Sequence, residues 1–66
     1  MRYRYQLTHI QSDIGESDLV YIGNSRDEAI IMIPEEYTLG GKIVTDYYEL
    51  KLTRNDGTNE VIIFAR

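Results

Sequence analysis

Side chains alternate near the N-terminus with the period of two that is typical of a half-buried strand. One side of this predicted strand carries Tyr3, Tyr5, Leu7 and His9. The polar stretch 11–18, which contains Gly15, predicts a loop. The apolar residues 19–22 predict a second strand, which ends at Gly23 and Asn24.

The same alternation returns at residues 47–53, followed by Asn55-Asp56-Gly57 and the apolar run 61–65. Asn and Asp suit the centre of a type I turn, and Gly57 supplies the positive φ that closes a bulged hairpin. We therefore predict a hairpin, whose first strand a β-branched stretch at 43–45 extends backwards. The last strand is apolar on both sides, so we expect its second side to lie under a helix, a loop or a partner.

Residues 25–36 allow two incompatible predictions. Ser25 followed by Glu28 is a capping-box pattern, and acids in the first turn favour a helix over 26–33. Pro34 would end this helix, whose core side would carry Ala29, Ile30 and Ile33. The β-branched isoleucines instead favour a buried strand.

With the helix, the chain is an α+β domain spanning residues 1–66. It is a small antiparallel sheet of four to five strands with one short helix, in the order β-β-α-β-β.

Composition narrows the function. The 66 residues contain no cysteine, which removes disulfides and thiolate zinc sites and leads us to expect a cytoplasmic protein. No signal peptide or membrane span is expected. Residues 11–41 carry seven acids and one arginine, a net of −6 within a chain of net charge −4. This acidic middle is either an ordinary solvated surface or a face for a basic partner, and it disfavours direct nucleic-acid binding.

The segment Glu28-Ala29-Ile30-Ile31-Met32-Ile33-Pro34-Glu35-Glu36 resembles a segment of the phage uracil-DNA glycosylase inhibitors. The hairpin around Gly57 and Asn59 is also similar to the last hairpin of that family. The resemblance implies a DNA-mimicking inhibitor that inserts an edge strand into the enzyme's DNA-binding cleft. It implies that Glu28, Glu35 and Glu36 contact the enzyme, and it requires the strand alternative.

Candidate catalytic and metal-binding groups are sparse. His9 is the only histidine, and we expect it to be a strand residue at the sheet margin. The acids in 13–18 lack the spacing of an EF-hand, and Gly40-Gly41-Lys42 lacks the context of a phosphate loop. We expect no enzyme, no metal site and no cofactor.

Three function hypotheses follow. The first is an interaction module, such as a phage or mobile-element inhibitor, that binds a DNA-processing enzyme through Asp27, Glu28, Glu35, Glu36, Tyr37 and Tyr47. The second is a self-associating module, a homodimer that pairs through sheet edges and buries Ile62 or Phe64. The third is a weak nucleic-acid binder that uses the arginines and tyrosines of the N-terminal strand.

Overall fold

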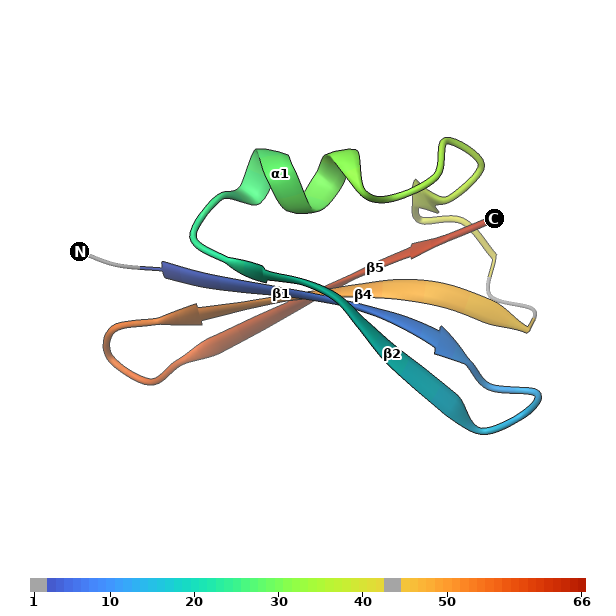
Figure 1. Cartoon of the computed structure of the whole chain (residues 1–66), viewed down its shortest axis with the longest axis horizontal. Coiled ribbons are helices and arrows are strands. Elements are labelled where there is room, and N and C mark those ends of the chain that lie inside the picture. Colours follow the sequence, from blue (N-terminus) through green and yellow to red (C-terminus); the bar gives the residue numbers. More distant parts are fainter. Residues whose placement is uncertain (1–2, 43–44) are drawn as a thin grey trace.

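The computed structural model describes residues 3–42 and 45–66, which form one antiparallel sheet and one helix (Figure 1). The strands are β1 (Tyr3–Gln11), β2 (Glu16–Gly23), β3 (Thr38–Leu39), β4 (Asp46–Arg54) and β5 (Asn59–Ala65), and the helix is α1 (Arg26–Ile31). Their order in the sheet is β2-β1-β4-β5-β3. The predicted α+β class is confirmed, with the two-residue β3 as an addition. Of the predicted extension at 43–45, residues 43 and 44 lie outside the described residues.

The predicted C-terminal hairpin is confirmed. Gly57 has a φ of 89°, and its amide donates to the carbonyl of Arg54 at 3.0 Å. The Asp56 carboxylate accepts from the amide of Thr58 at 3.0 Å and from its hydroxyl at 2.7 Å. The turn is therefore held by the residue types that predicted it.

The N-terminal hairpin differs from its prediction. β2 begins at Glu16, so residues 16–18 belong to the strand and not to the predicted loop. β2 is an outer strand of the sheet, and the side chains of residues 16–18 are exposed. Polar residues are tolerated at this position, because backbone pairing does not require the side chains to be buried. Their polarity predicted a loop, since it gives no sign of this pairing.

Residues 26–31 are helical, so the strand alternative for this segment is wrong. The Ser25 hydroxyl accepts from the amide of Glu28 at 3.2 Å, as the capping pattern predicted. The helix ends two residues before its predicted end, because a residue that precedes proline is disfavoured in the α conformation. The amide of Ile33 accordingly bonds three residues back, to the carbonyl of Ile30 at 3.0 Å.

The helix lies over one side of the sheet, and within residues 3–42 and 45–66 no helix lies over the other side (Figure 1). Under α1, Leu7 is paired with Leu50, and both are buried with Ala29. We call this the helix side of the sheet and the opposite one the open side. Side chains alternate between the two sides along each strand, so the pairing register assigns every strand residue to one of them. Ile62, opposite Leu50, therefore belongs to the helix side.

A β-bulge in β2 determines which residues of the apolar run 19–22 face the helix side and which face the open side. The register between β1 and β2 shifts after Leu7, so that Val20 is an extra residue. Such a bulge sets two residues against one, and both Val20 and Tyr21 pack against the core. Leu19 and Ile22 are returned to the open side, where they are 55% and 50% exposed.

Candidate functional site

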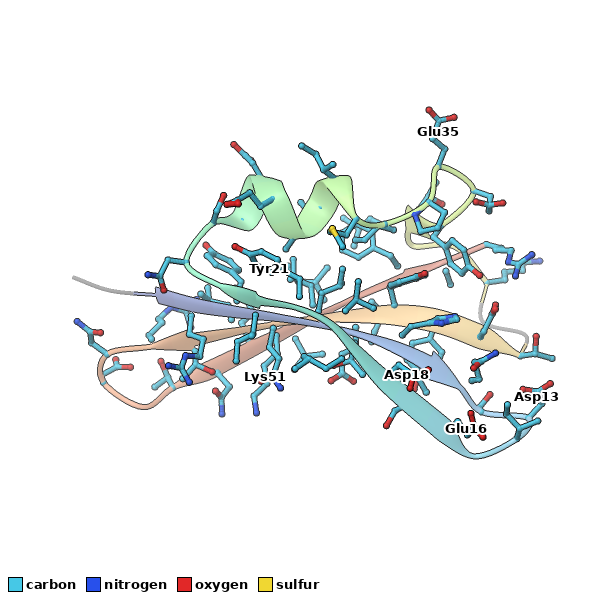
Figure 2. All side chains as sticks on the ribbon, in the orientation of Figure 1. Asp13, Glu16, Asp18, Tyr21, Glu35 and Lys51 are labelled. Atoms are coloured by element: carbon cyan, nitrogen blue, oxygen red, sulfur yellow. The ribbon has the colours of Figure 1, made fainter. Side chains whose placement is uncertain are left out.

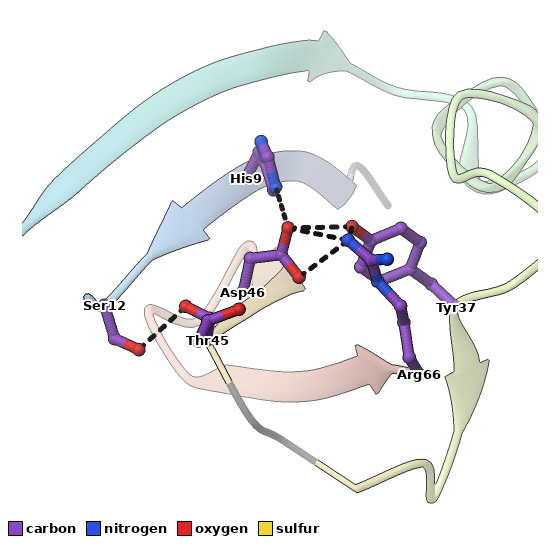
Figure 3. Close-up of polar contacts among 6 residues, drawn as sticks. All are labelled: His9, Ser12, Tyr37, Thr45, Asp46 and Arg66. Atoms are coloured by element: carbon purple, nitrogen blue, oxygen red, sulfur yellow. Dashed lines mark hydrogen bonds and ion pairs between the residues drawn. The ribbon is translucent and has the colours of Figure 1, made fainter. Parts of the chain in front are cut away.

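Four polar side chains from distant parts of the chain meet on the helix side, and we call them the Asp46 cluster: His9, Tyr37, Asp46 and Arg66 (Figure 3). The Tyr37 hydroxyl donates to Asp46 Oδ2 at 2.9 Å. The Arg66 guanidinium donates to the Tyr37 hydroxyl at 2.8 Å, and it contacts both carboxylate oxygens of Asp46 at 3.2 and 3.1 Å. His9 Nε2 lies 3.5 Å from Oδ2.

The aromatic rings of the Asp46 cluster also contact one another and the ring of Tyr48. The ring of Tyr48 stacks on His9 with centroids 4.6 Å apart, and it meets the ring of Tyr37 edge-on at 4.8 Å. The Arg66 guanidinium lies 4.9 Å from the centroid of Tyr37, within the range of a cation–π contact. The cluster thus joins β1, β4, the segment before β3 and the last residue of the chain.

The pKa values in the cluster move away from neutrality. Burial alone would raise the pKa of Asp46, but hydrogen bonds from Tyr37 and Arg66 outweigh it, and the pKa of Asp46 is lowered. Burial, followed by the hydrogen bond to Asp46, raises the pKa of Tyr37. Hydrogen bonds to Tyr37 and Asp46 raise the pKa of Arg66. A general acid or base works best with a pKa near the operating pH, so these shifts favour a bracing role over proton transfer.

An open cavity of about 260 Å³ lies beside the cluster, lined by Lys42, Thr45, Asp46 and Arg66. Small-molecule sites are usually larger, about 300–1,000 Å³. The Asp46 carboxylate at this cavity is already paired with Arg66. The hydroxyl of neighbouring Ser12 donates to the carbonyl of Thr45 at 2.9 Å (Figure 3). The cavity therefore offers little that could select a ligand.

The predicted acidic residues lie on the outer surface of α1 and of the turn that follows it. Asp27, Glu28, Glu35 and Glu36 are all exposed, and we call them the acidic helix surface. Figure 2 shows Glu35 directed away from the sheet. Ile31, at the end of α1, is 80% exposed, and the next residue, Met32, is 48% exposed. An apolar pair is thus flanked in the chain by carboxylates on both sides.

The two predicted tyrosines do not belong to this surface. Tyr37 is 9% exposed and makes its hydrogen bonds within the Asp46 cluster. Tyr47 is half-buried and faces the open side, because Tyr48 beside it packs on the core. Their role in partner binding stays a prediction.

The N-terminal strand separates the residues of the nucleic-acid hypothesis. Tyr5 packs against the core, whereas Arg4 is exposed on the open side. Within the described residues, this strand therefore does not place Arg4 and Tyr5 on one surface.

The Asp46 cluster had almost no signal in the sequence. The margin position expected for His9 is consistent with its exposure of 21%, but its carboxylate neighbour was not predicted. Asp46 and Arg66 are 20 residues apart in the chain, and Tyr37 and Arg66 are 29 apart. Asp46 begins β4, whereas Tyr37 directly precedes β3 and Arg66 directly follows β5, so these residues meet only when the sheet has formed.

Comparisons with protein-family models, curated proteins and solved structures found no match. Across residues 3–42 and 45–66, no group of three or more His, Asp or Glu side chains is placed to hold a metal ion. In the same residues, no helix is long and apolar enough to cross a membrane.

Proposed function

We propose that this protein is a small, non-enzymatic interaction module that binds a basic protein through the acidic helix surface. The observation that carries the proposal is the exposure of Ile31, 80%, between pairs of exposed carboxylates. Interfaces gain most of their binding energy from a few apolar or aromatic anchors that become buried, surrounded by a rim that excludes water. Charged rim residues contribute to partner choice and to the rate of association.

The chemistry of the surface defines the partner. A partner needs an apolar hollow for Ile31 and Met32 and a rim of lysine or arginine that meets the carboxylates. Such a basic rim is also the footprint of a nucleic-acid-binding surface. The narrower form of the proposal is therefore a DNA-mimicking inhibitor of a DNA-processing enzyme, acting in the cytoplasm.

The narrower form uses a helix where the glycosylase inhibitors use a strand. Residues 26–31 already make helical hydrogen bonds, so their backbone is not free to extend a sheet. Carboxylates in place of phosphates are the shared chemistry. Four exposed carboxylates, two before and two after an exposed apolar pair in the chain, support this proposal without any edge strand.

Two charge-reversed variants with equal net charge test the proposal. E35K/E36K alters the acidic helix surface, and D13K/E16K alters the far end of the β1–β2 hairpin, where both acids are exposed (Figure 2). The immobilised protein should retain a partner from a lysate of its source, and D13K/E16K should retain it equally. E35K/E36K and I31D should lose it, and added salt should weaken retention. Equal loss in both charge variants would contradict the proposal.

Purified uracil-DNA glycosylase tests the narrower form. The protein should inhibit excision of uracil from DNA, and E35K/E36K should not. If excision continues unchanged at a large excess of the protein, the resemblance carries no function, and the general proposal depends on the retention experiment alone.

A further inference from the structure

The open side of the sheet carries two neighbouring rows of side chains that run across the strands. The first row consists of Leu19, Thr8, Glu49 and Ile63, on β2, β1, β4 and β5 in that order. It reads apolar, polar, acidic, apolar. Leu19 is 55% exposed, and the side chain of Glu49 at the centre of the sheet is half-buried.

The second row lies two residues further along each strand, or three along β2, because of the bulge. It consists of Ile22, Gln6, Lys51 and Val61 on the same strands in the same order. It reads apolar, polar, basic, apolar. Ile22 is 50% exposed and Val61 is 49% exposed. Figure 2 shows Lys51 on the side of the sheet away from α1.

We propose that the open side binds a second copy of the same chain, with the first row of each copy lying on the second row of the other. The two copies are related by a two-fold axis that lies midway between the two facing sheets. This axis is parallel to the rows and runs between them, so it places the first row of one copy over the second row of the other. Position by position, every residue then meets a matching one: Leu19 with Ile22, Thr8 with Gln6, Glu49 with Lys51, and Ile63 with Val61. The interface is isologous, as in most homodimers.

The opposite charges make a second copy the fitting occupant. Glu49 and Lys51 are two residues apart on β4, so the two-fold axis generates two reciprocal ion pairs at the centre of the interface. Two facing sheets pack about 10 Å apart with their side chains interdigitated, which brings these pairs within reach. The three most exposed apolar residues of the rows, Leu19, Ile22 and Val61, are covered at the same time.

The sheet edges are less suited to self-association. The edge strand β2 carries the exposed acids Glu16 and Asp18 and a bulge, and charges and bulges on an edge oppose pairing between chains. At the other edge, β3 pairs only with Phe64 and Ala65 of β5, and the part of β5 that it does not cover begins with the exposed polar residues Asn59 and Glu60. Self-association is therefore assigned to the face of the sheet. On β5, the proposed interface buries Val61 and Ile63, in place of the Ile62 or Phe64 expected from the sequence.

Sedimentation equilibrium over a wide concentration range tests the proposal, with circular dichroism to verify the fold. The wild-type protein should reach twice the monomer mass. E49K and K51E each bring like charges together and should raise the dissociation constant at least about tenfold. The double variant E49K/K51E, and an equimolar mixture of the two single variants, should recover the dimer, because both restore opposite charges. E28K and K42E are controls of equal charge change, and both should remain dimeric.

A second measurement needs no variant. In a mixture of isotope-labelled and unlabelled wild-type protein, isotope-filtered NMR should show contacts between Val61 of one copy and Ile63 of the other. A wild-type protein that stays monomeric overturns the proposal. So do single reversals that leave the dimer intact, a double variant that fails to recover it, or NMR contacts at β2 backbone or α1 instead. The acidic helix surface takes no part, so this test is independent of the proposed function.

Discussion

Removal of the Tyr37 hydroxyl tests whether the Asp46 cluster braces the fold. In Y37F the ring remains, so its edge-on contact with Tyr48 and its burial are preserved. The variant loses the hydrogen bond to Asp46 at 2.9 Å and the one from Arg66 at 2.8 Å. Y37F therefore measures the contribution of the Tyr37 hydroxyl, which links its own segment to Asp46 and to Arg66.

The expected loss of stability in Y37F depends on the contacts that Asp46 and Arg66 retain. A hydrogen bond to a charged group contributes about 1.5–3 kcal/mol to stability. Asp46 and Arg66 keep their contacts with each other, and the Arg66 side chain is 56% exposed, so water can replace the lost partner. We therefore expect a loss near the lower bound, about 1.5 kcal/mol, from a total of about 3–10 kcal/mol for a chain of this length. With a urea m-value of about 1 kcal/mol per molar, the midpoint falls by about 1.5 M.

The stability difference between wild type and Y37F should depend on pH, whereas a simple loss of packing would not make it do so. The lowered pKa of Asp46 stabilises the fold above the ordinary aspartate value of about 4, and this contribution is lost as the pH falls through the folded-state pKa. Tyr37 is one cause of the lowering. The difference in unfolding free energy between wild type and Y37F should therefore shrink from neutral to strongly acidic pH.

The assay is urea unfolding followed by far-ultraviolet circular dichroism at both pH values. Y47F is the matched control, because within the described residues the Tyr47 hydroxyl has no hydrogen bond, and it should change stability by less than about 0.5 kcal/mol. An effect of Y37F no larger than that of Y47F, or one that is the same at both pH values, would refute a bracing role for the cluster.

Three further substitutions test the fold. S25A removes the cap that accepts from the Glu28 amide, and it should cost about 1 kcal/mol of unfolding free energy in urea, with reduced helical dichroism. L7A opens a cavity at a fully buried site and should cost about 2–5 kcal/mol, enough to lower the thermal midpoint sharply in calorimetry. G41A drives a β-carbon into the backbone carbonyl of Ala65, so amide exchange at the end of β5 should accelerate, whereas exchange in the β1–β2 hairpin should not change.

Local patterns predicted the elements whose cause is local. Ser25 and Glu28 are three residues apart, and their hydrogen bond marks the start of α1 as predicted. The turn at Gly57 is likewise built from neighbours. The resemblance to the glycosylase inhibitors required a strand at residues 28–33. The capping pattern of Ser25 and Glu28 predicted a helix there, and residues 26–31 are helical.

Features that depend on pairing between distant strands could not be predicted. Alternation shows that Glu49 and Lys51 share a side of β4, but it does not show that Thr8 and Ile63 flank Glu49. The bulge at Val20 has no sequence signature beyond an apolar run. The same holds for the Asp46 cluster, since its members come together only after the sheet has its final register.

The order of the strands has a kinetic consequence. β1–β2 and β4–β5 are hairpins that close over short turns, whereas β1 meets β4 only by joining Gln11 to Asp46 and Tyr3 to Arg54. Closing a long loop costs entropy before its contacts form, so such pairing is slow. We therefore expect folding to proceed by docking of the two hairpins along one seam, with Leu7 opposite Leu50 at its middle. Substitutions at this seam should slow folding, whereas those on the outer strands should mainly speed unfolding.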